Sequence, residues 1–155
     1  MLVPLLLGSE SDKDFAKKIT DELDLFGVKH DVIVVSAHKA PEKVLTVVEK
    51  LNASTEPVCY ITVAGRSNGL SGVTAASSVH PVIACPPFAN KEDYLVNIHS
   101  TLQMPSDTPV LTVIDPKNAA LAAVRILALQ DENLRKKVEE KIAQTKSSFD
   151  VSRYE

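Results

Sequence analysis

Residues 2–12 read Leu-Val-Pro-Leu-Leu-Leu-Gly-Ser-Glu-Ser-Asp, so a run of apolar residues ends directly in a short polar loop. Two further apolar runs, at 32–35 and 58–64, end in the same way, in Ser36-Ala-His-Lys39 and Gly65-Arg-Ser-Asn-Gly69. Short buried runs are typical of parallel strands, whose carboxyl ends meet at one edge of the sheet. We therefore expect the three loops to converge on one ligand, as in an enzyme.

Helical patterns separate the apolar runs. Pro41 is placed to open one helix after the second run, and Gly27 is placed to end the helix after the first. The patterns predict strands at 2–7, 32–35, 58–64, 81–84 and 110–114, and helices at about 13–26, 41–51, 70–77, 92–102, 117–129 and 132–149. This alternation predicts a three-layer, doubly wound parallel α/β sheet of the flavodoxin-like type.

The chain has 155 residues, of which 45% are hydrophobic, and no break in composition divides it. These values predict one domain over 1–155 that ends in a helical extension at about 130–155. The extension carries a thin apolar stripe made of Leu134, Val138, Ile142 and Phe149. The preceding helix, 117–129, is apolar nearly all round, so we expect it to pack between subunits of a homo-oligomer as well as on its own sheet.

Charge and composition argue against several partners. The net charge of -3 and the lack of Trp disfavour a nucleic-acid surface. The apolar start is too short to span a membrane and has no basic leader, and two cysteines without a disulfide framework favour a reducing cytoplasm. Histidines and carboxylates lack metal-ligand spacing, so we expect no metal.

The first loop, Gly8-Ser-Glu-Ser-Asp12, joins a strand end to a helix start. Free N–H groups and the helix dipole favour an anion there, while a carboxylate such as that of Asp12 can accept hydrogen bonds from sugar hydroxyls. Phosphate and ribose are therefore suitable ligands. The simpler alternative is that Ser11 and Asp12 only cap the following helix.

The second loop combines Ser36, His38 and Lys39. An imidazole exchanges protons near neutral pH, and an adjacent ammonium can add charge for a phosphate. A single loop histidine is more often a polar surface group, so the neighbours of His38 make it the candidate. The remaining histidines lack such neighbours; these are His30, His80 and His99.

The third loop runs from Ala64 to Gly72 and contains three glycines after Ala64, which permit close approach of the backbone to a ligand. Neither the dinucleotide-binding glycine pattern nor the phosphate-loop lysine motif is present, so nicotinamide cofactors and nucleoside triphosphates lose support. The alternative is a glycine-rich turn that the strand-to-helix connection requires.

Taken together, the motifs resemble those of the phosphoribosylaminoimidazole carboxylase family of purine biosynthesis. The resemblance covers nearly all of the chain up to about Leu129. It rests on Gly8-Ser-Glu-Ser-Asp12, Ser36-Ala-His-Lys39, Ala64-Gly-Arg-Ser-Asn-Gly69, Pro81-Val-Ile-Ala-Cys-Pro-Pro87, Met104-Pro-Ser106 and Asn118-Ala-Ala-Leu121. Class I members, which are mutases of N5-carboxyaminoimidazole ribonucleotide, usually have Arg after Ser-Ala-His and a third loop of Gly-Gly-Ala-Ala-His-Leu-Pro type. Lys39 and Arg66-Ser-Asn-Gly69 make this chain resemble class II, which carboxylates 5-aminoimidazole ribonucleotide (AIR) directly.

The resemblance implies carboxylation of AIR by CO2 to 4-carboxy-5-aminoimidazole ribonucleotide (CAIR), without ATP, biotin, metal or other cofactor. It implies that His38 transfers the proton and that Asp12 binds ribose. The substrate-binding set implied is Ser9, Ser11, Asp12, Ser36, Lys39, Gly65, Arg66, Ser67 and Asn68. Family members are commonly homo-oligomers, here an octamer or tetramer. Two alternatives stay open: the class I mutase, and a noncatalytic flavodoxin-like module that binds a nucleotide or flavin.

Overall fold

The computed structural model describes residues 1–150 and contains one five-stranded sheet in which all strands are parallel, in the order β2-β1-β3-β4-β5. The strands are β1 (Val3–Leu7), β2 (His30–Val34), β3 (Tyr60–Val63), β4 (Val82–Ala84) and β5 (Leu111–Thr112). The predicted doubly wound sheet is confirmed. β2 begins two residues earlier than its apolar run because edge pairing with β1 starts at His30, which lies opposite Val3.

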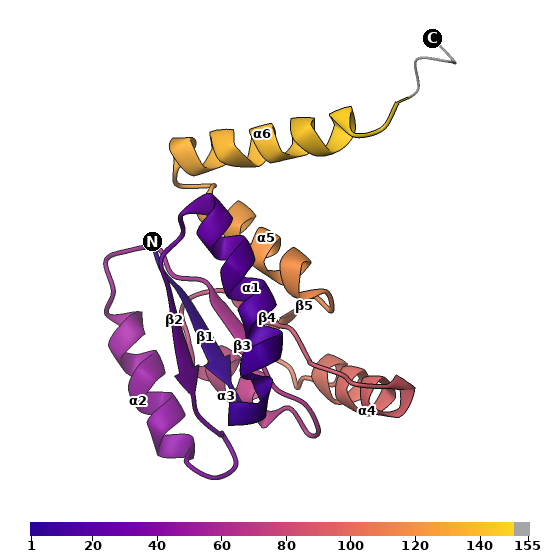
Figure 1. The fold of residues 1–155 in the computed structure, drawn as a ribbon. Coiled ribbons are helices and arrows are strands. Elements are labelled where there is room, and N and C mark those ends of the chain that lie inside the picture. Colours follow the sequence, from indigo (N-terminus) through magenta and orange to yellow (C-terminus); the bar gives the residue numbers. More distant parts are fainter. Residues whose placement is uncertain (151–155) are drawn as a thin grey trace.

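Helices alternate with the strands and cover both faces of the sheet (Figure 1). A short 3-10 turn, η1 (Glu10–Asp12), precedes the first of them. The helices are α1 (Lys13–Phe26), α2 (Pro41–Asn52), α3 (Gly69–Ser77), α4 (Lys91–Leu102), α5 (Pro116–Leu127) and α6 (Glu132–Ser147). α1 and α5 share the core on one face, whereas α2 and α3 share the core on the other. α4 extends beside the carboxyl edge of the sheet.

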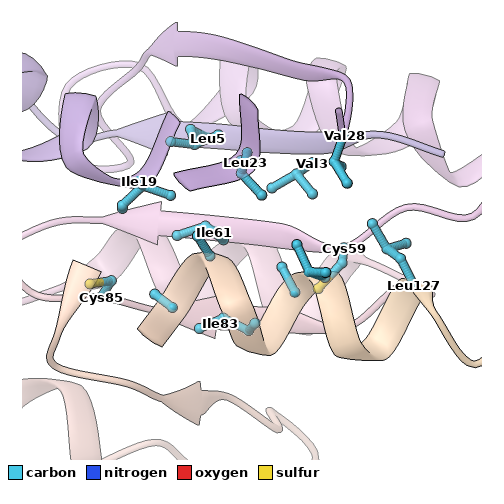
Figure 2. Packing of buried hydrophobic residues seen from close by; sticks show 14 of the residues in the cluster. Val3, Leu5, Ile19, Leu23, Val28, Cys59, Ile61, Ile83, Cys85 and Leu127 are labelled. Atoms are coloured by element: carbon cyan, nitrogen blue, oxygen red, sulfur yellow. The ribbon is translucent and has the colours of Figure 1, made fainter. Parts of the chain in front are cut away.

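β1 shows how the sequence builds both cores. Val3, Leu5 and Leu7 point toward α1 and α5, and Leu2 and Leu6 point toward α2 and α3. Side chains alternate between the faces of a strand, so an unbroken apolar run is what a strand buried on both faces requires. Figure 2 shows the packing on the α1 and α5 face, where side chains of β1, β3 and β4 meet those of the helices.

The two ends of α1 differ in how well they follow the sequence prediction. Gly27 ends the helix with a φ of 67°, the left-handed conformation that favours glycine. At the other end Asp12 occupies the capping position but makes no side-chain capping hydrogen bond. Ser9 caps the preceding turn by accepting from the amide of Ser11. The prediction that Ser11 and Asp12 cap the helix is therefore wrong, because the extra turn moves the cap to Ser9.

The C-terminal region differs in part from its prediction. α6 crosses the ends of α1 and α5, and the ammonium of Lys137 donates to the carbonyl oxygen of Phe26 over 2.7 Å (Figure 1). Leu134 is buried as expected, but Phe149 follows the end of the helix and is 73% exposed. Phe149 therefore does not belong to the stripe. Residues 151–155 of the predicted extension lie outside the described part of the chain.

The strand ends are level with one another at the edge that carries the candidate loops. Leu7 pairs with Val34 of β2 on one side and with Val63 of β3 on the other. All three loops therefore leave the sheet at one height, as the sequence predicted. Within residues 1–150, no helix is both long and apolar enough to cross a membrane.

Candidate active site

A cavity of about 560 Å³ opens at the carboxyl edge of the sheet. The chain passes from β1 to β2 on one side and returns to β3 on the other, so the crevice between the loops after β1 and β3 is the switch point at which open α/β sheets bind ligands. Five of the predicted site residues line the cavity: Ser9, Ser11, Asp12, Gly65 and Arg66. The structure thus joins the first and third loops in one pocket.

Asp12 offers this cavity a carboxylate that the helix does not use for capping. Its partial burial raises the pKa of the carboxyl above its ordinary value, and a hydrogen bond with the Ser9 backbone opposes that effect. Hydroxyl groups of a ligand could donate to this carboxylate and so replace the water that burial removes. The carboxylate of Asp12 therefore lines the cavity and can accept hydrogen bonds from a polar ligand.

His38 lies against the third loop and outside the set of residues that lines the cavity. Its Nε2 is 3.2 Å from the Oγ of Ser67, and both side chains are exposed to solvent. Gly69 allows this approach, because a Cβ built there would lie 3.0 Å from Nε2 of His38. The ring is therefore held at the carboxyl edge with one nitrogen directed at the loop after β3.

Ser36 and Lys39 flank His38. Ser36 is half-buried and its carbonyl oxygen accepts from the amide of Ala40 over 2.9 Å, which closes the turn that leads into α2. Lys39 is exposed. An exposed ammonium on a flexible stem suits the binding of a phosphate that enters from solvent.

Asn68 differs from the other predicted site residues because its side chain is buried. Its Oδ1 accepts from the amide and the hydroxyl of Ser71, and its Nδ2 donates to Oγ1 of Thr101 over 2.8 Å. The prediction that Asn68 belongs to the substrate-binding set stays a prediction, and the structure places its side chain inside the loop. In this position Asn68 caps α3 and connects the third loop to α4.

Several further residues line the cavity and were not predicted as site residues from the sequence. They come from α1, from the loop after β4 and from α4: Asp14, Phe15, Lys18, Pro87, Phe88, Ala89, Asp93 and Asn97. The sequence placed Pro87 in a motif of the family resemblance and placed others of these residues in predicted helices, but it assigned none of them to the site. Asn97 stands out, because it is a buried polar residue in the middle of a helix.

Other reactive groups contribute little to this edge. Burial raises the pKa of both cysteine thiols, Cys59 and Cys85, to about 12, so neither supplies a thiolate near neutral pH. Among residues 1–150, no group of three or more His, Cys, Asp or Glu side chains is arranged to hold a metal ion. The imidazole of His38 faces the loop after β3.

The order of the sheet defines a flavodoxin-like α/β fold, and the cavity lies at the carboxyl edge, where open sheets of this kind bind ligands. The AIR carboxylase family model matches residues 2–148. The chain belongs to the AIR carboxylase family.

Two relatives and one solved structure illustrate the similarity. A phosphoribosylaminoimidazole carboxylase of Archaeoglobus fulgidus is 44% identical over 138 residues, which cover 89% of this chain and 75% of the relative. An N5-carboxyaminoimidazole ribonucleotide mutase of Methanocaldococcus jannaschii is 43% identical over 139 residues, which cover 88% of this chain and 85% of the relative. The crystal structure of Treponema denticola PurE superposes with a TM-score of 0.89 and 39% identity over 95% of this chain and 92% of that one.

Proposed function

We propose that this chain catalyses the reversible carboxylation of AIR by CO2 at C4 of the imidazole to give CAIR, a step of purine biosynthesis. The observation that carries the proposal is the His38–Ser67 contact beside a cavity of about 560 Å³ in a chain of this family. The relative named a carboxylase supports CO2 as the donor. Because another relative is named a mutase, transfer of the carboxylate from the N5-carboxylated isomer is the second candidate for the reaction.

The first chemical step forms the new carbon–carbon bond. The amino group of AIR donates electron density into the imidazole, so the ring behaves as an enamine and C4 attacks the carbon of CO2. The product of this step is a tetrahedral C4 that carries both its original hydrogen and the new carboxylate. Holding the two reactants in contact supplies much of the rate, because the reaction becomes effectively unimolecular.

The second step removes the hydrogen from C4. Neutral His38 takes it as a proton, the electron pair of the C–H bond returns to the ring, and aromaticity is restored. In the reverse direction the protonated imidazole returns the proton to C4, and CO2 leaves. One residue therefore serves both directions, and no external oxidant or reductant is needed.

The loop after β3 has two tasks in this proposal. Its amides, from Gly65 to Gly69, are suited to stabilising the carboxylate as its charge develops, since fixed donors require little reorganisation during the reaction. Ser67 also contacts His38 and so fixes the ring that transfers the proton. Asn68 belongs to the proposed substrate-binding set as a member of this loop, and its buried side chain holds the loop from inside.

The remaining residues bind the ribonucleotide. Asp12 accepts from ribose hydroxyls, and Ser9 and Ser11 lie beside it in the same cavity. Lys39, with Ser36, binds the phosphate from the opposite loop. These groups contact parts of the substrate that do not react, so their contribution is to affinity and orientation.

We also propose a homo-oligomer, an octamer or a tetramer, in the cytoplasm. Apolar side chains exposed near α5 and α6 support association between copies: Leu25 is 72% and Leu129 is 84% exposed. Both cysteines are free and buried, which suits a reducing compartment. Light scattering on the purified chain measures the number of subunits directly.

A label experiment tests the proposed reaction. The enzyme receives AIR in a buffer equilibrated with ¹³C-bicarbonate and without ATP, and the carboxyl carbon of the product is observed by NMR. We expect enzyme-dependent appearance of labelled CAIR and loss of the C4 proton. Binding of AIR without any labelled product would reject the enzyme in favour of a nucleotide-binding module.

A further inference from the structure

We propose that Asn97 and Thr101 of α4 are positioning residues that fix Ser67 against His38. This inference rests on the proposed function, because it assigns Ser67 and His38 to the site of proton transfer. Asn97 and Thr101 lie one helical turn apart on the buried side of α4. Neither residue contacts His38 in the hydrogen bonds of the described chain, so their effect is transmitted through the loop after β3.

Asn97 uses both ends of its amide to join two loops. Its Oδ1 accepts from the backbone amide of Arg66 over 2.7 Å, and its Nδ2 donates to the carbonyl oxygen of Pro87 over 2.6 Å. The contact is so close that a Cβ built on Gly65 would lie 2.8 Å from Nδ2 of Asn97. The close packing of Asn97 against the loop therefore requires glycine at position 65.

Thr101 connects α4 to the other end of the same loop. Its hydroxyl accepts from Nδ2 of Asn68 and donates to the carbonyl oxygen of Asn97. From Asn68 the hydrogen bonds continue to Ser71 and then to Thr62 of β3. All of these side chains except that of Asn97 are at most 3% exposed, so loss of one partner leaves a buried polar group unsatisfied.

Ser67 lies between the two anchored residues. Arg66 has a φ of 59° and Asn68 a φ of 20°, conformations that side-chain-bearing residues rarely adopt and that the surrounding structure must hold. Asn97 and Thr101 of α4 form hydrogen bonds with these two residues, Arg66 and Asn68 respectively. The geometry therefore fixes the direction of the Ser67 hydroxyl, which is the group that contacts His38.

A matched pair of substitutions at Thr101 tests the inference. Thr101→Val keeps the shape of the side chain and removes the hydroxyl, whereas Thr101→Ser keeps the hydroxyl. Loss of one hydrogen bond of about 1.4 kcal/mol corresponds to a tenfold change in rate. We expect Thr101→Val to lower kcat about tenfold with the KM for AIR within twofold, and Thr101→Ser to retain kcat within twofold. Ser100→Ala, on the adjacent residue, is the control and should retain both parameters.

Amide hydrogen exchange provides a readout that does not depend on turnover. We expect Thr101→Val to accelerate exchange at residues 66–69 while β1 exchanges as in the unmodified chain. Unchanged kcat and unchanged loop exchange in Thr101→Val would overturn the inference, as would an equal loss of kcat in the valine and serine variants. If the unmodified chain does not carboxylate AIR, the proposed function fails, and exchange at 66–69 alone then decides whether α4 holds the loop.

Discussion

Nε2 of His38 lies 3.2 Å from Oγ of Ser67, although the two residues are 29 positions apart in the chain. The contact joins the loop after β2 to the loop after β3, which are not neighbours in the sheet because β1 separates their strands. The aligned ends of Leu7, Val34 and Val63 bring the loops to one height. Position in the fold, rather than proximity in sequence, therefore supplies the imidazole with its partner.

The proposed role of His38 in proton transfer predicts the effect of His38→Asn. Asparagine keeps a polar side chain but cannot exchange the proton at C4, and general acid–base catalysis typically contributes 10² to 10⁴ in rate. We expect kcat to fall at least about a hundredfold, with the affinity for AIR changed less than about threefold. Steady-state kinetics and calorimetric titration with AIR measure the two quantities. His99→Asn, at an exposed position on α4, is the control, and substantial turnover in His38→Asn would remove His38 from the mechanism.

Lys39 should act through binding. Its proposed target is a phosphate that does not react, so Lys39→Ala should raise the KM for AIR about tenfold and change kcat less than about threefold. The effect should weaken at high ionic strength, since salt screens exposed charges. Lys43→Ala, an exposed lysine on α2, controls for general loss of charge. A large fall in kcat with unchanged KM would place Lys39 beside the reacting carbon instead.

Much of the fold could be predicted because apolar runs, prolines and Gly27 mark the elements directly. Successive side chains of residues 2–7 enter two different cores, as expected for an unbroken apolar run in a strand that is buried on both faces. The 3-10 turn at Glu10–Asp12 could not be foreseen, since Ser9, Ser11 and Asp12 are all good capping residues and only the backbone path decides among them. Phe149 was misassigned because helical spacing continues past the point where α6 ends.

The sequence predicted which loops form the candidate site, but it did not predict how their side chains are oriented. Sequence order indicated that three polar loops meet, but it carried no information on which side chains turn inward. Asn68 is buried because it caps α3 and reaches Thr101. Asn97 lines the cavity from the helix predicted at 92–102, to which the sequence assigned no site residue. Contacts between residues more than thirty positions apart depend on packing that local patterns do not encode.

Asp12 should affect stability and binding in opposite directions. Burial raises the pKa of its carboxyl in the folded chain, so the protonated form stabilises the fold fully below the ordinary value of 3.8, and that stabilisation is lost as pH rises through the folded pKa. Asp12→Asn should therefore unfold at a higher temperature than the unmodified chain at pH 7 and at the same temperature near pH 3. The same change should raise the KM for AIR about tenfold, through loss of charge-assisted hydrogen bonds. Equal thermal midpoints at pH 7 would contradict the effect of burial.

Gly65 and Asn97 should be energetically coupled. A Cβ at position 65 would meet Nδ2 of Asn97 at 2.8 Å, so Gly65→Ala should displace the loop and lower kcat about tenfold or more. Asn97→Ala removes the atoms that the new Cβ would meet, and Gly65→Ala should cost little more in that background. A double-mutant cycle on kcat measures this coupling, which we expect to exceed about 1 kcal/mol. Additive losses would show that the two residues act separately.

The choice of carboxyl donor decides between direct carboxylation and the mutase reaction. The enzyme is assayed without ATP by ultraviolet absorbance of CAIR, once with AIR and a series of dissolved CO2 concentrations, and once with the N5-carboxylated isomer in buffer stripped of CO2. We predict that CAIR forms from AIR at a rate that rises with CO2, and that the N5 isomer is used poorly. Efficient use of the N5 isomer, with no product from AIR and CO2, would contradict direct carboxylation and make this chain a mutase.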